Sequence, residues 1–125
     1  MTARVSQIIG QALFDAGTLL TYVPATGGQD IHNHFCSLSS LNHPISFHEE
    51  VAFTLAHGAA LTGKRACAMM KGHGLAKAAN SVVDALFAGT TAGLVIMILE
   101  DPLGKHSDSI LNSAPLLTGM GVPFR

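Results

Sequence analysis

The hydrophobic pattern of the chain alternates between a helical period and short uninterrupted apolar runs. Apolar residues about three or four positions apart indicate amphipathic helices, and short apolar runs indicate buried strands. We expect helices over residues 5–16, 29–38, 49–63 and 110–120 and another around 79–87, with Ala79, Val82, Val83, Leu86 and Phe87 on one face. We expect strands over residues 18–24, 64–70 and 93–101, the start of another at 122–124, and a short strand or extended link at 41–48.

The order of these elements predicts the fold class. Helices and strands alternate along the chain, which is typical of an open, mainly parallel sheet with helices on both faces. We therefore expect one α/β domain over residues 1–125, built as three α/β/α layers. Ligands of such sheets bind beyond the carboxyl ends of the strands. The segments expected there, residues 24–30, 71–77 and 100–108, are rich in glycine and polar side chains.

Composition adds an expectation about partners. Hydrophobic residues make up 48% of the 125 residues and charged residues only 12%, about half the usual share of charge. So little charge on a small domain predicts that part of the surface packs against another subunit. The net charge is −1 and the basic residues do not cluster, which argues against a nucleic-acid or anionic-membrane partner.

Location and thiol state follow from the same composition. No apolar run approaches the roughly 20 residues that span a bilayer, and the N-terminus lacks the pattern of a signal peptide. We therefore expect a cytoplasmic protein in which Cys36 and Cys67 are buried, reduced thiols.

Two acidic residues, Glu49 and Glu50, stand at the head of a very apolar expected helix. Acids in the first turn of a helix are favoured by the helix dipole, so both residues could have an ordinary structural role. A carboxylate beside so many apolar residues would also be costly to bury without a partner. The pattern alone leaves open whether one of the two acids has a chemical function.

Four segments of the chain, in order, carry a resemblance to a known family. They are "ALFDAGTLLTYVPATGGQDI" (12–31), "HEEVAFTLAHGAALTGK" (48–64), "MMKGHGLAKAANSVVDA" (69–85) and "GLVIMILEDPLGKHSDS" (93–109). Together they resemble the pyrimidine-binding (PYR) domain of thiamine diphosphate-dependent enzymes. The last segment resembles the branch that includes indolepyruvate:ferredoxin oxidoreductase, and the decarboxylases of sulfopyruvate and phosphonopyruvate form a nearby branch.

The resemblance implies roles for particular residues. In the family pattern the activating acid precedes a helix glycine by nine residues, and Glu49 stands in that position before Gly58. The resemblance implies that Glu49 is catalytic, because this acid bonds a ring nitrogen of the aminopyrimidine and so activates the cofactor. The residues that it implies in cofactor binding are Pro24, Thr26, Glu49, Gly72, His73 and Gly74.

The chain departs from the family pattern in the segment "KGHGLAK". His73 stands where a proline is more common and Lys77 where an asparagine is frequent. The role of His73 stays open between a proton shuttle and a solvated side chain. The polar segment that holds Asp101, His106, Ser107 and Asp108 is equally open between a substrate contact and an ordinary loop. The spacing of the histidines and cysteines indicates no metal site on this chain.

The sequence contains no GDG motif, which in the family binds magnesium and the diphosphate. The resemblance therefore implies a subunit or fragment of a larger enzyme, with Mg²⁺ held by a GDG-bearing partner domain. The partner would complete a homodimer or hetero-oligomer that decarboxylates a 2-oxo acid, oxidatively or not. Two alternatives stay open: a non-catalytic structural subunit that keeps only the fold, and a small-ligand binder with "PATGG" as an anion-binding turn.

Overall fold

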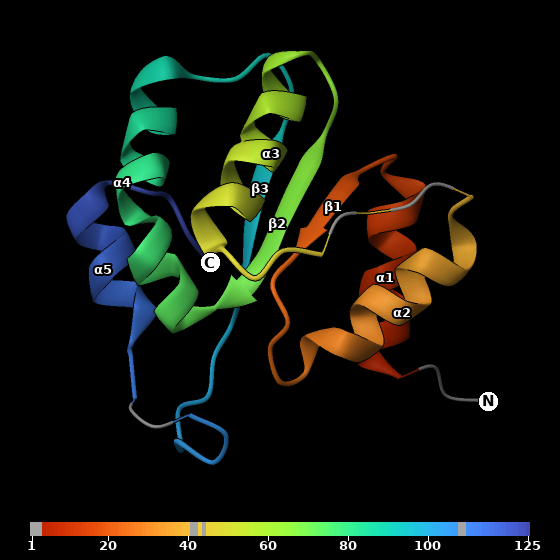
Figure 1. The fold of residues 1–125 in the computed structure, drawn as a ribbon, viewed down its shortest axis with the longest axis horizontal. Coiled ribbons are helices and arrows are strands. Elements are labelled where there is room, and N and C mark those ends of the chain that lie inside the picture. Colours follow the sequence, from red (N-terminus) through yellow and green to blue (C-terminus); the bar gives the residue numbers. More distant parts are fainter. Residues whose placement is uncertain (1–3, 41–42, 44, 108–109) are drawn as a thin grey trace.

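The computed structural model describes residues 4–40, 43, 45–107 and 110–125 of the chain. Helices and strands alternate along most of the chain, but two successive helices separate the first strand from the second (Figure 1). The elements are α1 (Val5–Asp15), β1 (Leu19–Tyr22), α2 (Gly28–Leu38), α3 (Glu49–Leu61), β2 (Ala66–Lys71), α4 (Gly72–Ala88), β3 (Leu94–Leu99) and α5 (Ser113–Met120). In the expected link at 41–48, the described part contributes a single bridge between Tyr22 and Ile45.

The three strands form one parallel sheet in the order β1-β2-β3. The central strand, β2, is buried from Ala66 to Met70 because it has a neighbour on each side. The apolar run at residues 93–101 indicated a buried strand, but β3 is not fully buried, since Val95 is 56% exposed. Strand β3 lies at the edge of the sheet, where it pairs with β2 alone within the described chain.

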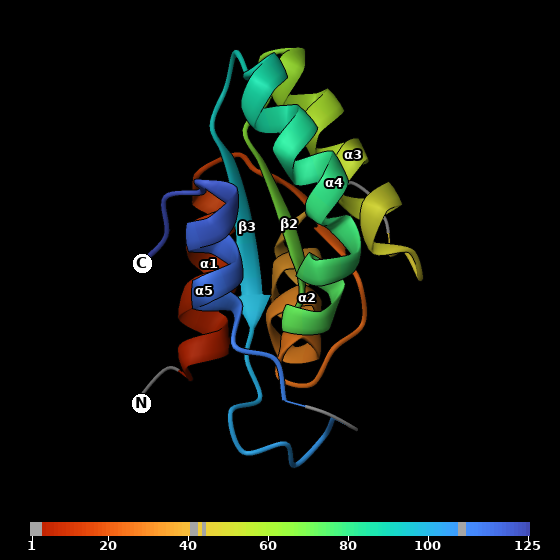
Figure 2. The same cartoon turned by 90° about the vertical axis from the view of Figure 1, so that its left-hand side faces the viewer.

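Helices cover both faces of the sheet, so the domain has three α/β/α layers (Figures 1 and 2). Successive side chains of a strand point to opposite faces. Cys67 and Met69 of β2 accordingly pack in the cluster beneath α1 and α2. Ala68 and Met70 pack in the cluster beneath α3, α4 and α5. The predicted fold class is confirmed.

One buried hydrogen bond fixes α3 against the sheet. The hydroxyl of Thr21, in β1, donates to the backbone oxygen of Ala52 at 2.8 Å. Thr21 is fully buried, and Ala52 lies one turn beyond the start of α3. The bond therefore ties the N-terminal part of α3 to the middle of β1.

The passage from β2 to α4 differs from the expected loop at residues 71–74. Lys71 ends β2 and is also the N-cap residue of α4, which begins at Gly72 without any intervening loop. Gly72 and Gly74 permit this because neither carries a side chain. A Cβ at position 72 would lie 2.7 Å from Ser113 Oγ, so the first turn of α4 packs tightly against α5.

Two further expectations near the C-terminus need correction. The face that α4 buries consists of Leu75, Ala78, Val82 and Ala85, whereas Val83, Leu86 and Phe87 are exposed, Phe87 by 97%. The pattern misleads because apolar residues continue around the helix. Residues 122–124 form no strand: the N–H of Val122 donates to Leu117 O and closes the end of α5.

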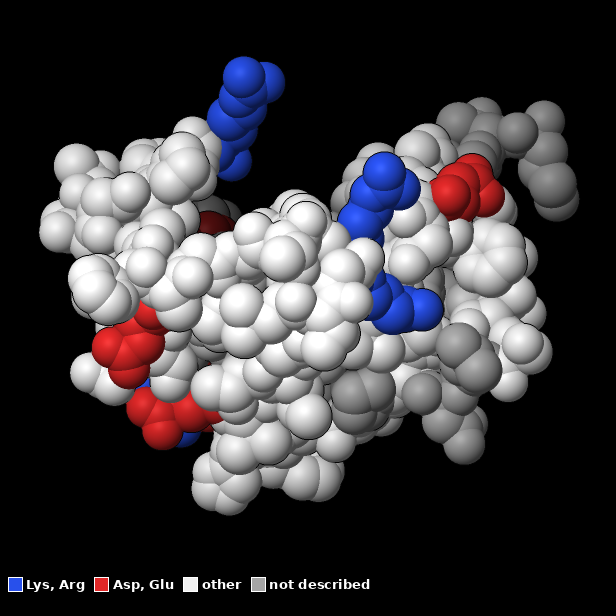
Figure 3. Space-filling model, turned by 90° about the horizontal axis from the view of Figure 1, so that it is seen from above, with Lys and Arg blue, Asp and Glu red and all other residues white. Residues whose placement is uncertain are grey.

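The surface carries few charges and many partly exposed apolar side chains. Figure 3 shows wide uncharged areas between isolated charged side chains on the face seen from above. Both cysteines are free; Cys67 is buried as expected, but Cys36 is only partly buried. No helix in the part of the chain that the structure describes is long and apolar enough to cross a membrane.

Candidate functional site

Glu49 is the first residue of α3 and is nearly buried. It is 8% exposed, follows the N-cap residue His48, and belongs to an acidic first turn with Glu50, which is exposed. Its Oε2 lies 3.6 Å from Nζ of Lys77 in α4. The Lys77 side chain is 69% exposed, so solvent screens this ion pair. Glu49 is thus a mostly buried carboxylate at the start of an apolar helix, and the Lys77 ammonium lies on its solvent-exposed side.

Glycine at position 74 allows the Glu49 side chain to pack against α4. A Cβ at position 74 would meet Glu49 Cγ at 2.7 Å and Glu49 Oε1 at 3.4 Å. Distances near 2.7 Å are too short for two carbon atoms, so only glycine allows this approach. The first turn of α4 and the first turn of α3 therefore meet at Glu49.

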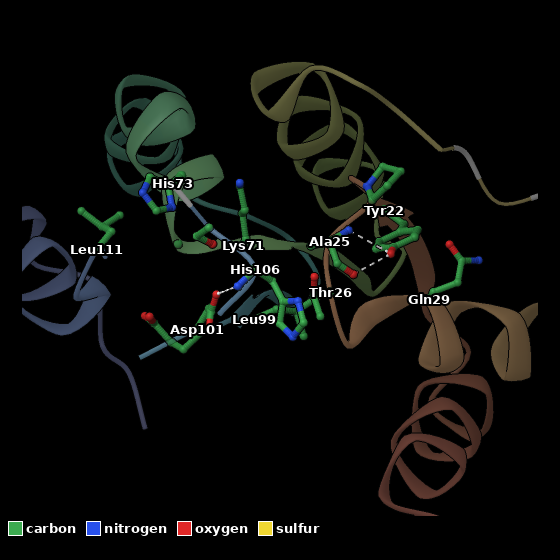
Figure 4. A pocket seen from close by; sticks show the side chains of 14 residues that line it. Tyr22, Ala25, Thr26, Gln29, Lys71, His73, Leu99, Asp101, His106 and Leu111 are labelled. Carbon is green, nitrogen blue, oxygen red and sulfur yellow. Dashed lines mark hydrogen bonds between the residues drawn. The ribbon is translucent and has the colours of Figure 1, made fainter. Parts of the chain in front are cut away.

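A cavity of about 430 Å³ opens beside these helix starts, at the carboxyl ends of the three strands. Figure 4 shows side chains from several elements around it. Four predicted cofactor-binding residues line it together: Pro24, Thr26, Gly72 and His73. The other lining residues are Tyr22, Ala25, Gln29, Lys71, Leu99, Glu100, Asp101, His106, Ser107 and Leu111.

Glu49 and Gly74 do not line this cavity. Successive residues of a helix point about 100° apart, so the first turn of α4 presents different residues to different sides. Gly72 and His73 face the cavity, whereas Gly74 faces Glu49. The predicted site residues therefore form two adjacent groups, joined by one turn of α4.

The cavity contains two acidic residues, and both bind backbone N–H groups. Oε1 of Glu100 accepts a hydrogen bond from the N–H of Ser113, at the start of α5, at 3.1 Å. Asp101 accepts from the N–H of His106 at 2.7 Å and from that of Lys105 at 3.1 Å. The His106 N–H in particular lowers the pKa of Asp101. These bonds give the segment after β3 a defined turn.

The tyrosine of β1 orders the turn on the opposite side of the cavity. The Tyr22 hydroxyl donates to Ala25 O at 3.1 Å and accepts from Ala25 N–H at 3.0 Å (Figure 4). The ring of Tyr22 also stacks on that of His32, with centroids 4.9 Å apart. His32 is buried, and desolvation lowers its pKa. The segment that carries Pro24 and Thr26 is therefore held by a buried aromatic pair.

Sequence reasoning missed Tyr22, Lys71 and Leu99, the last residues of β1, β2 and β3. Their position at strand ends is a signal that could have identified them, because ligand sites of such sheets lie there. Asp101, His106 and Ser107 line the cavity, while Asp108 lies outside the described residues. Among the residues that are described, no group of three His, Cys, Asp or Glu side chains could hold a metal ion.

Comparison with known proteins gives one informative similarity. No protein-family model matches the chain. Over 62 residues the chain is 42% identical to indolepyruvate oxidoreductase subunit IorA of Archaeoglobus fulgidus. The matched region is half of this chain but only about a tenth of that relative. The similarity is therefore to one part of an oxidoreductase subunit.

Proposed function

We propose that the chain supplies the pyrimidine-binding half of the cofactor site of a thiamine diphosphate-dependent enzyme that acts on a 2-oxo acid. The observation that carries the proposal is Glu49, a nearly buried carboxylate in the first turn of α3, with Gly74 packed against it. The similarity to an indolepyruvate oxidoreductase subunit favours an oxidoreductase over a non-oxidative decarboxylase.

The residues around Glu49 fit the pyrimidine half of this cofactor. The carboxylate is mostly shielded from water, yet Lys77 is its only ion-pair partner within the described chain and lies at the solvent side. A buried carboxylate in such surroundings gains from a neutral or proton-donating ring placed against it. Glycine at position 74 lets the Glu49 side chain pack against the first turn of α4, which holds the carboxylate in place.

Each residue has a task in this proposal. Glu49 Oε holds or shares a proton with the pyrimidine ring, and α3, anchored by Thr21, keeps that oxygen in place. Gly74 and the first turn of α4 position Glu49, and the neighbouring cavity accommodates the reacting acid. When bound, the cofactor supplies the electron sink for cleavage beside a carbonyl group. The diphosphate and Mg²⁺ belong to a GDG-bearing partner domain or subunit.

The test compares Glu49→Gln with the wild-type chain after each is combined with its GDG-bearing partner. Glutamine keeps the shape of the side chain but cannot exchange a proton, so turnover of the 2-oxo acid should fall on the order of 10²–10⁴-fold. Glu50→Gln is the matched control, because Glu50 is exposed and points about 100° away around α3. Equal turnover by wild type and Glu49→Gln would refute the proposal.

A further inference from the structure

The cavity at the strand ends contains a lysine that forms no ion pair within the described residues. Lys71 is the last residue of β2, is partly buried, and lines the cavity. Figure 4 shows its side chain between His73 and Ala25 in the view into the cavity. Within the described residues, Lys71 forms no ion pair and no hydrogen bond through its ammonium group. An ammonium group in a cavity, without an acidic partner, gains most from an anionic ligand.

The two acids of the same cavity are bound by backbone N–H groups and form no ion pair with Lys71. Glu100 accepts from the N–H of Ser113, and Asp101 accepts from the N–H groups of Lys105 and His106. Both carboxylates therefore bind their own chain segment beyond β3. Both still carry negative charge in the cavity, and Glu100 Oε2 would lie 3.6 Å from a Cβ at Gly72, so this acid lies near the start of α4.

The first turn of α4 adds a second positive feature beside Lys71. Lys71 caps this helix without a side-chain hydrogen bond, and the first turn contains no acidic residue. The positive end of a helix of 17 residues therefore lies at the same wall as the ammonium group. The remaining wall is apolar, with Tyr22, Pro24, Leu99 and Leu111 among the lining residues. The cavity volume of about 430 Å³ is that of a small-ligand site.

We propose that Lys71 is the anchor for the carboxylate of a singly charged organic acid in this cavity, and that Glu100 and Asp101 exclude acids with a second carboxylate. The identification of that acid as a 2-oxo acid rests on the proposed function. In this arrangement the carboxylate binds the Lys71 ammonium, the apolar part of the ligand packs against Leu99 and Leu111, and a second carboxylate would face two like charges. Lys71 thus selects ligands by charge and positions them, whereas Glu49 acts on the cofactor.

The experiment titrates three probes into the isotope-labelled full chain without thiamine diphosphate and follows backbone chemical shifts by NMR. The probes are 2-oxopentanoate, its neutral amide, and 2-oxoglutarate, which has the same carbon chain and a second carboxylate. We expect 2-oxopentanoate to bind more tightly than either of the other two. Equal affinity for the acid and the amide would overturn the role of Lys71, and equal affinity for the two acids would overturn the exclusion by Glu100 and Asp101.

Variants separate a specific anchor from general electrostatics. Lys71→Met should weaken 2-oxopentanoate binding about ten- to a hundredfold, because a hydrogen bond to a charged group is lost. Lys71→Arg should retain most of the affinity, which excludes misfolding as the cause. Lys105→Met removes the same charge from an exposed position that does not line the cavity, and should change affinity by less than about twofold. Unchanged binding by Lys71→Met would refute the inference.

Glu100→Gln tests the exclusion of diacids directly. Its side-chain oxygen can still accept from Ser113 N–H, so the start of α5 is preserved. This variant should reduce the difference in affinity between 2-oxopentanoate and 2-oxoglutarate. An unchanged difference in affinity would count against the exclusion of diacids. Failure of this inference is distinct from failure of the proposed function. Probe binding requires no cofactor, whereas the comparison of Glu49→Gln with wild type measures cofactor-dependent turnover alone.

Discussion

Gly74 of α4 and Glu49 of α3 are in such close contact that a Cβ at position 74 would lie 2.7 Å from Glu49 Cγ. The same Cβ would lie 3.2 Å from Met70 Cβ, in the central strand. Position 74 therefore determines where the Glu49 carboxylate lies relative to the sheet.

Replacing Gly74 by alanine should push Glu49 away and destabilise the fold. Overpacking of a well-packed site costs about 1–3 kcal/mol, which exceeds the gain of about 1 kcal/mol from alanine in a helix. The free energy of unfolding, measured in urea, should therefore fall. Gly58→Ala is the matched control in α3, where a Cβ would meet nothing within 4 Å. That variant should stabilise the chain by about 0.5–1 kcal/mol, and equal stabilisation by both would contradict the close packing.

Stability should decrease in mild acid because of His32 and His43. Desolvation lowers the pKa of His32, and desolvation, the charge of His32 and that of Lys64 lower the pKa of His43. A lowered pKa means that the folded state binds fewer protons than the unfolded state as pH falls below about 6.5. Stability is therefore complete at higher pH and is lost as pH falls through the unfolded pKa toward the folded one.

The measurement is the urea-unfolding free energy at about pH 7.5 and about pH 5.5, across the titration range of histidine. His32→Phe keeps an aromatic ring against Tyr22 and removes one titrating group, so it should reduce the difference between the two values. A wild-type chain that is equally stable at both pH values would show that His32 and His43 titrate alike in the folded and unfolded states.

The two thiols should differ strongly in reactivity. Burial raises the pKa of Cys67 to about 12, and partial burial also raises the pKa of Cys36, which is less covered. A thiol reagent at neutral pH should modify Cys36 slowly in the folded chain and Cys67 only after unfolding. Titration of the freshly prepared, denatured chain without reductant should find both thiols free. A denatured chain without free thiols would mean that the two cysteines are oxidised.

Assembly should depend on the exposed apolar side of α3. Val51, Leu55 and Leu61 are about half exposed there, which is typical of a surface that packs against another chain. Sedimentation at micromolar concentration should give a mass above that of the 13.0 kDa monomer, either alone or with the GDG-bearing partner. Leu55→Lys should weaken the association. Thr118→Lys, at an exposed position of α5, should not. A chain that stays monomeric under both conditions would contradict this prediction.

The sequence allowed the order of the elements and the position of Glu49 to be predicted, because helical and strand periods were distinct in those segments. It did not reveal that β2 passes directly into α4, because glycines usually mark a loop. Here Gly72 and Gly74 instead allow α4 to pack closely against its neighbours. The buried face of α4 was also misassigned, because Phe87 and Val83 are apolar yet exposed. Lys71 was not singled out, because its place in the cavity depends on contacts between segments far apart in the sequence.

The absence of a loop between β2 and α4 has a consequence for how the cavity can respond to a ligand. Lys71 is hydrogen-bonded into the sheet at one end and begins a long helix at the other, so its backbone has little freedom to lose. Loops that become ordered on binding reduce affinity by the entropy of that ordering. This wall of the cavity is preorganised, and the main adjustment left to it is rotation of the lysine side chain.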